Sequence, residues 1–301
     1  PTNFPAFALT PAARERIAFL SGEADRWRNT PDLPFKHCNE PDHFLDLDDL
    51  PLFGLTPATV SPFRHEFTAQ LALARAVRPT NFPPMDPAKN PDKTKELVGF
   101  LPWTITEFQG KLKSAFSYLR TFEQSGGTPD EIANAQANVI YVMGVMSHFV
   151  GDAAQPLHAT KHYNGWVGPN PQGYTTNRTF HRWIDGGFIQ KSGLKAEDLR
   201  PRVRSARPLA DARWPGLSTN MFPVIMAFLQ ATAEQVEPLY RLEKARQLTG
   251  QEGPGSPGYE LIAAQLLQAA HLLGDLWLTA WQEAPPDTFL ERELGKRQEG
   301  N

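Results

Sequence analysis

His148 and Asp152 lie four residues apart, and His181 and Asp185 repeat this spacing. Positions four apart share one face of a helix, so an imidazole and a carboxylate at this spacing can reach the same metal ion. A further histidine, His158, follows the first pair by six residues. One such pair alone is usually a hydrogen-bonded pair on a helix surface, but two pairs and a fifth donor in under forty residues favour a metal site.

The donor types indicate the metal and the chemistry. The single cysteine, Cys38, excludes an intrachain disulfide and a thiolate zinc cage. Imidazole nitrogen and carboxylate oxygen are the usual zinc ligands in the absence of cysteine. Two helices that meet at their ligand faces can hold two ions a few ångströms apart, and this arrangement hydrolyses phosphate esters. The spacing therefore predicts a zinc-dependent hydrolase.

A third pair at the same spacing, His271 and Asp275, lies in a leucine-rich segment. We expect this pair to be structural, with a core histidine bonded to its own helix. Other hydrolytic schemes have little support, because the chain contains no His-Glu-x-x-His and no Gly-x-Ser-x-Gly motif.

Helical signals position these residues. The clearest is Thr128-Pro129-Asp130-Glu131, which combines a cap, a first-turn proline and acids favoured by the helix dipole. Thr104 and Glu107 predict a second capping box. Thr10, as an N-cap, and Pro11, in the first turn, predict the start of a third helix. No alternating strand pattern appears. The sequence predicts an all-α fold with helices over residues 11–21, 63–77, 104–122, 128–152, 180–189, 218–248 and 258–281.

Length and composition bound the organisation. A chain of 301 residues without an evident linker predicts one large domain over residues 1–284, followed by a charged, loosely held tail over 285–301. The net charge of −3 argues against a stable nucleic-acid complex, although it leaves nucleic acid open as a substrate. No run approaches the ~20 apolar residues of a transmembrane segment. The N-terminus has no signal-peptide pattern, and its start at Pro1 suggests a trimmed form.

The segment from His148 to His158, HFVGDAAQPLH, resembles the central signature of the zinc-dependent phospholipase C and S1/P1 nuclease superfamily. The segment around His43, DHFLDLD, is similar to the family's early histidine segment, and Leu101-Pro102-Trp103 to a recurrent core turn. The stretch from His181 to Asp185 resembles the family's last metal pair. The likeness covers most of the chain, from about residue 14 to residue 284.

This resemblance implies a single helical domain with a cluster of zinc ions at the bottom of a cleft. One ion would be held by Asp25, His43, His148 and Asp152, and a second by His158, His181 and Asp185. Asp152 would also reach a third ion. Asp25 would in addition be catalytic, orienting or deprotonating the water that attacks phosphorus. Asp32 is a nearby competitor for the place of Asp25.

One departure from the family concerns the third ion. The family holds it with the amino group of an N-terminal tryptophan and a histidine shortly afterwards, whereas this chain begins Pro1-Thr2-Asn3-Phe4 and has no histidine before His37. We expect two zinc ions from this chain, and a third if the missing tryptophan and histidine segment is restored.

The resemblance also implies the substrate class. The segment 156–164 is more similar to the phospholipase C branch, whereas the interval from His158 to His181 and the aspartate at 185 are more similar to the nuclease branch. We expect Tyr163, Asn164 and Trp166 to contact a phospholipid head group or a single-stranded nucleic acid.

Phospholipase C-like hydrolysis is the favoured interpretation. The alternatives are a single-strand nuclease or 3′-nucleotidase and a non-catalytic helical binding protein with structural zinc. The family further implies a secreted or periplasmic protein, which we expect to be a monomer.

Overall fold

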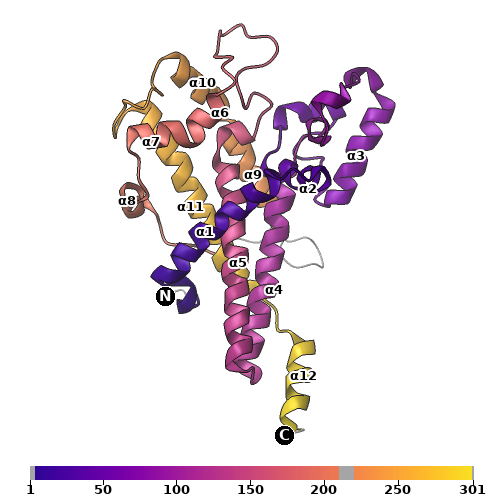
Figure 1. The fold of residues 1–301 in the computed structure, drawn as a ribbon, viewed down its shortest axis with the longest axis vertical. Coiled ribbons are helices and arrows are strands. Elements are labelled where there is room, and N and C mark those ends of the chain that lie inside the picture. Colours follow the sequence, from indigo (N-terminus) through magenta and orange to yellow (C-terminus); the bar gives the residue numbers. More distant parts are fainter. Residues whose placement is uncertain (1–3, 210–219, 300–301) are drawn as a thin grey trace.

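The computed structural model describes residues 4–209 and 220–299, and within these ranges it contains no named strand. The expectation of an all-α fold is confirmed. The chain folds into a helical body from which one end of a long helical pair extends (Figure 1). Only two isolated β-bridges occur in the described part, one of them between Leu45 and Gly99.

The centre of the fold is an antiparallel pair of long helices, α4 (Leu101–Ser125) and α5 (Pro129–Ala154). Both helices pack against α11 (Pro257–Glu283), and α5 also packs against α1 (Pro11–Arg28), which crosses it (Figure 1). The buried side chains of α4 and α5 include Trp103, Phe116 and Met143. Since a fully buried large apolar side chain contributes about 1.5–3 kcal/mol, this layer is the main source of stability.

Local signals set both ends of α5. The Thr128 hydroxyl accepts from the Glu131 backbone nitrogen at 3.2 Å, and the Glu131 carboxylate accepts from the Thr128 nitrogen at 2.8 Å, so the predicted capping box is confirmed. The helix ends at Ala154 because the residue before Pro156 adopts an extended backbone. His148 and Asp152 therefore lie in its last two turns.

A smaller second core supports the other pair. It joins α6 (Phe180–Arg182), a π-helical turn (Trp183–Gly187), α7 (Phe188–Ser192), α10 (Val236–Lys244) and the start of α11. Phe188 and Tyr240 are its largest fully buried side chains. The turn that carries His181 and Asp185 is thus anchored on a packed layer.

Shorter elements complete the described fold: α2 (Leu33–Asn39), α3 (Arg64–Val77), α8 (Ala196–Leu199), α9 (Phe222–Ala233) and α12 (Thr288–Glu299). Several 3₁₀ turns link them, including Glu40–His43, Leu47–Phe53 and Pro156–His158.

Two helix predictions were wrong in detail. The helix expected to start at Thr104 begins at Leu101, with Pro102 in its first turn, and Thr104 is interior, with its hydroxyl bonded to the Phe100 carbonyl and to Arg64. The predicted helix over 218–248 is divided into α9 and α10, and positions 218–219 lie outside the described residues. The division falls at Glu234 because the ring of Pro238 clashes with the carbonyl four residues earlier.

The tail also differs from expectation. Residues 288–299 form α12, whose Leu294 is almost fully buried against the end of the α4–α5 pair, and Arg297 forms two bonds to Glu131 at 2.9 and 3.0 Å. The prediction of a loosely held tail is wrong for these residues, because Leu290 and Leu294 pack against the main core and Arg297 pairs with Glu131.

By length and composition alone, α11 is apolar enough to cross a membrane, which the sequence analysis did not anticipate. In the fold, 39% of the most apolar 18-residue stretch of α11 is buried, and the helix packs against α4, α5 and α10. A core helix of a soluble protein passes the same test.

Candidate metal centre

A cleft of about 640 Å³ opens between α1, the end of α5, the α6–α7 segment and α11. Six of the seven side chains predicted to bind metal line it. These are Asp25, His148, Asp152, His158, His181 and Asp185. The seventh, His43, is buried directly behind His148 and Asp152.

The first group of donors comes from three separate elements. Asp25 lies on α1, His43 ends the turn Glu40–His43, and His148 lies on α5. One donor atom of each lies within 4.8 Å of the others. His148 Nε2 is 3.1 Å from His43 Nδ1 and 4.0 Å from Asp25 Oδ1. This group is therefore assembled by tertiary packing.

The second group is more compact. His158 Nε2 and His181 Nε2 face each other at 2.9 Å, and Asp185 Oδ2 lies 2.9 Å from His181 Nε2. His181 and Asp185 meet through their four-residue spacing, although the turn between them is π-helical rather than α-helical. The structure thus brings together the three residues to which the resemblance assigns one ion.

Asp152 lies between the two groups. Its Oδ2 is 2.8 Å from His43 Nδ1 and 3.3 Å from His148 Nε2, whereas its Oδ1 is 3.8 Å from His158 Nδ1. Burial alone would raise the pKa of this carboxyl, but the imidazoles of His158, His148 and His43 outweigh burial and hold it well below its usual range. The surroundings therefore favour the ionised form of this carboxylate.

Backbone pairing ties the first group to the second. Leu45 N donates to His158 O at 2.9 Å, and Leu47 N donates to Ala159 O at 3.3 Å. The Nδ1 of His158 is also hydrogen-bonded to the His43 carbonyl. Because a carbonyl can only accept, the proton is on Nδ1, and the lone pair of Nε2 points towards His181.

The donor set fits zinc. Tetrahedral zinc with bonds of about 2.0–2.1 Å separates neighbouring ligand atoms by roughly 3.3 Å. The shortest separations within the groups, 2.9 and 3.1 Å, are close to this value. Two imidazole nitrogens that face each other can share only one proton, so a cation between them satisfies both lone pairs.

The pKa values differ between the groups. Burial lowers the pKa of His158, which favours the neutral, ligating form. Burial opposes the charge on His148 as well, but Asp152 and Asp25 leave the pKa of this imidazole raised. Burial opposes the charge on Asp185, but the hydrogen bond and charge of His181, together with His158 and Gln155, lower the pKa of this carboxyl.

The two candidate aspartates near the first group have different surroundings. The carboxylate of Asp32 accepts from the Phe35 nitrogen at 3.3 Å and caps α2. Asp25 instead lines the cleft next to His148, with half of its side chain exposed. The geometry therefore places Asp25, and not Asp32, with the metal-binding donors.

The residues predicted to contact substrate are scattered. Trp166 stacks on His162 with centroids 3.9 Å apart and also touches Tyr240 in the second core, so it packs the loop. Tyr163 is 49% exposed and lies 6.0 Å from the His181 ring, at the rim of the second group. The Oδ1 of Asn164 is buried without a partner among the described residues. None of these three is among the described residues that line the cleft.

Several residues of the cleft were not predicted from the sequence. Arg28, one helical turn after Asp25, lines the cleft with its Nε 3.9 Å from the Asp25 carboxylate and 3.6 Å from that of Glu40. Arg28 follows Asp25 by three residues, and this helical spacing could have identified it as a neighbour of Asp25. Gln155 also lines the cleft and hydrogen-bonds to Asp185. The cleft's apolar wall consists of Ile184, Ile189, Ile262 and Leu266.

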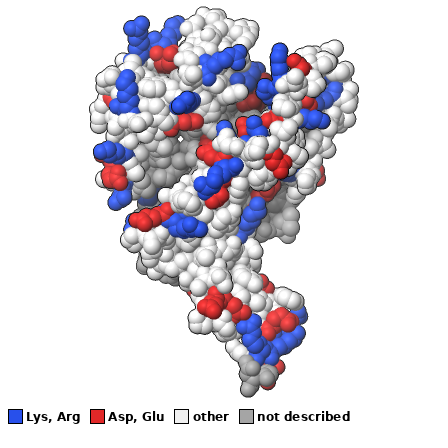
Figure 2. Space-filling model, viewed as in Figure 1, with Lys and Arg blue, Asp and Glu red and all other residues white. Residues whose placement is uncertain are grey.

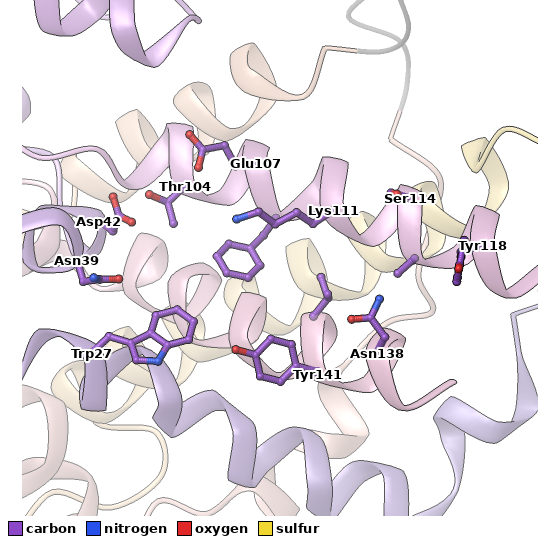
Figure 3. A pocket seen from close by; sticks show the side chains of 13 residues that line it. Trp27, Asn39, Asp42, Thr104, Glu107, Lys111, Ser114, Tyr118, Asn138 and Tyr141 are labelled. Carbon is purple, nitrogen blue, oxygen red and sulfur yellow. The ribbon is translucent and has the colours of Figure 1, made fainter. Parts of the chain in front are cut away.

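A second hollow of about 560 Å³ lies between α1, α4 and α5, and Asn39 and Asp42 line one end of it (Figure 3). Trp27 and Tyr141 line it from α1 and α5. At one end, Asp42 is paired with Arg64 at 2.8 Å, and the same guanidinium nitrogen bonds to Thr104. This network fixes the turn before His43, and none of the clustered metal-binding donors lines the hollow.

The third His-x-x-x-Asp pair lies elsewhere on α11. Asp275 accepts from both terminal nitrogens of Arg204, at 2.8 and 2.6 Å, and from the Arg207 backbone nitrogen at 2.7 Å. His271 Nε2 accepts from the Arg204 backbone nitrogen at 3.1 Å. The histidine is thus bonded to the neighbouring segment and not, as predicted, to its own helix.

Comparison of the chain with protein-family models, with curated proteins and with solved structures found no match.

Proposed function

We propose that this chain is a zinc-dependent phosphoesterase of the phospholipase C and S1/P1 nuclease type. The observation that carries the proposal is the convergence of donors from separate chain segments into two groups, with Asp152 between them. Imidazole nitrogens face one another at 2.9 and 3.1 Å, a separation that one shared proton or one cation satisfies, and the carboxylates of Asp152 and Asp185 beside them favour the cation. Two bound zinc ions account for it.

When bound, the two ions supply a water of lowered pKa, near ~7, and neutralise charge on the phosphoryl oxygens. The protein's own residues supply position and proton transfer. Asp25 is the most exposed carboxylate of the centre and lies 4.0 Å from His148, so it can hold the attacking water and accept its proton. Arg28, beside it in the cleft, provides a guanidinium for a phosphate oxygen.

The wall of the cleft supports the phospholipase C branch. Ile184, Ile189, Ile262 and Leu266 form an aliphatic surface, and no Phe, Tyr or Trp is among the described residues that line the cleft. Single-stranded nucleic acids are usually held by stacking on aromatic rings, whereas an aliphatic surface suits the apolar part of a lipid.

One observation favours the nuclease alternative. Tyr163 is half-exposed at the rim of the second group, where a base could stack on it. The third possibility is a helical binding protein in which zinc is structural.

Hydrolysis assays separate these three functions. The zinc-loaded chain is incubated with phosphatidylcholine vesicles, single-stranded DNA and RNA, and Asp152→Asn serves as the inactive control. We expect release of phosphocholine from the vesicles. Release of nucleotides alone would establish the nuclease function, and a zinc-loaded chain that hydrolyses none of the substrates would establish the binding protein. Secretion to the periplasm or beyond, and a monomeric state, remain predictions.

A further inference from the structure

Gln155 occupies the junction between α5 and the turn Pro156–His158 and uses both ends of its side-chain amide. Its Nε2 donates to Asp185 Oδ1, and its Oε1 accepts from the Leu157 backbone nitrogen at 3.0 Å. Its backbone nitrogen also donates to Asp152 O at 3.0 Å, and its carbonyl accepts from His158 N at 2.9 Å. One residue is therefore bonded to three of the residues that form the centre.

The bond to Asp185 fixes a carboxylate that would otherwise rotate. Asp185 has 45% of its side chain exposed and lies in a π-helical turn, so burial does little to orient it. With Oδ1 held by Gln155, Oδ2 faces His181 Nε2 at 2.9 Å. Ordering an exposed side chain costs conformational entropy. Because the hydrogen bond to Gln155 already orders the Asp185 carboxylate, metal binding loses less entropy.

The bond to Leu157 fixes the other side of the same group. The Gln155 oxygen caps the turn Pro156–His158, which has no other side-chain cap at its start. The last residue of this turn is His158, whose Nε2 faces His181. The two ends of one amide thus hold the two ligands on either side of His181 in position.

We propose that Gln155 is a positioning residue that presets His158, His181 and Asp185 for one zinc ion. The inference rests on the proposed zinc centre and extends it to a residue that is not itself a ligand. Outer partners that orient metal ligands typically change metal affinity by about ten- to a hundredfold when they are removed.

The test compares zinc binding by the full chain with two variants of this position. Gln155→Leu removes both bonds. Gln155→Ser keeps a capping hydroxyl for the Leu157 nitrogen but cannot reach Asp185. We expect both variants to bind zinc at the second group about ten- to a hundredfold more weakly, with the first group unchanged. Cobalt(II) absorption provides a second readout, because displacement of Asp185 changes the ligand field of that site alone.

Gln265→Leu is the matched control. Gln265 lines the same cleft, its Nε2 is buried without a partner among the described residues, and none of the described metal-binding donors bonds to it. We expect its zinc affinities and its cobalt(II) spectrum to equal those of the unmodified chain.

The outcomes distinguish the role of Gln155 from the proposed zinc-dependent function. An unmodified chain that binds no zinc would overturn both. An unmodified chain that binds two zinc ions, with the same affinities in Gln155→Leu and Gln155→Ser, would overturn the role of Gln155 alone. Equal weakening of both groups in Gln155→Ser would also overturn it, because it would reveal a general defect of the fold.

Discussion

The floor of the cleft and the middle of α11 contain the same His-x-x-x-Asp spacing in different surroundings. In α11, both oxygens of Asp275 are bonded to one guanidinium, and His271 accepts from a backbone nitrogen. In the cleft, the carboxylates of Asp152 and Asp185 face imidazoles. A carboxylate whose two oxygens are already bonded to a guanidinium is unavailable to a metal, whereas the cleft carboxylates lie beside imidazole nitrogens that are able to bind the same ion.

This difference shows what the spacing leaves open. The four-residue interval places two side chains on one helix face, but the neighbouring segments decide what completes their hydrogen bonds. For α11 that neighbour is Arg204, and for the cleft it is another histidine from a distant turn. The role of each His-x-x-x-Asp pair therefore depends on the side chains that contact it, and substitution of these side chains tests the role.

The largest effect is expected from Asp152→Asn. The substitution removes the carboxylate charge beside His43 and His148 and leaves Asp25 as the only carboxylate of the first group, so zinc content should fall from about two ions per chain towards one. Elemental analysis of the purified variant measures this. Asp275→Asn is the matched control and should retain both ions. Full zinc occupancy in Asp152→Asn would contradict the assignment of Asp152 as a ligand.

Arg204→Ala tests the α11 pair. The substitution leaves the buried Asp275 carboxylate without its cationic partner, and breaking a buried ion pair in this way costs about 3 kcal/mol. Urea unfolding should show this loss of free energy of unfolding while zinc content stays unchanged. A variant as stable as the unmodified chain would show that the pair is solvated in solution.

Asp25→Asn separates the two candidate aspartates of the first group. We expect zinc affinity at that group to fall by about tenfold, because Asp25 is its most exposed donor and the other donors remain. Asp32→Asn, which changes a residue at the cap of α2, should leave zinc affinity as it was. The reverse result, measured by competition with a chromogenic chelator, would exchange their roles.

The smallest effect is expected from His271→Ala. It removes one hydrogen bond to the Arg204 backbone, which is worth about 1 kcal/mol, and should leave both zinc ions in place. Thermal unfolding and zinc content measure the two parts of this prediction. Loss of one zinc equivalent would place the third pair in a metal site after all.

The sequence predicted those parts of the fold that local chemistry determines. Thr128, Pro129 and Glu131 fixed the start of α5 through bonds within four residues. Thr104 failed as a predicted cap because its hydroxyl is used by Arg64, which lies 40 residues away. Pro238 is a helix-breaking residue inside the predicted helix over 218–248, and it explains why that helix is divided.

The site divides in the same way. Spacing identified His148, Asp152, His158, His181 and Asp185, because helical geometry relates most of them locally. Asp25 and His43 reach His148 only through the packing of α1 and of the turn Glu40–His43, so family resemblance was needed to suggest them. The role inferred for Gln155 depends on the direction of one side-chain amide, which no spacing specifies.

The charged surface gives no independent guide to the centre, since Lys and Arg side chains alternate with Asp and Glu over the visible face (Figure 2). Evidence for a zinc centre in the cleft must therefore come from the metal itself. The most direct test is the zinc content of the full chain, purified without chelator and measured by elemental mass spectrometry. We expect about two zinc ions per chain, the number held by a two-metal hydrolytic site. A zinc content near zero, in a chain that is folded by circular dichroism, would contradict it.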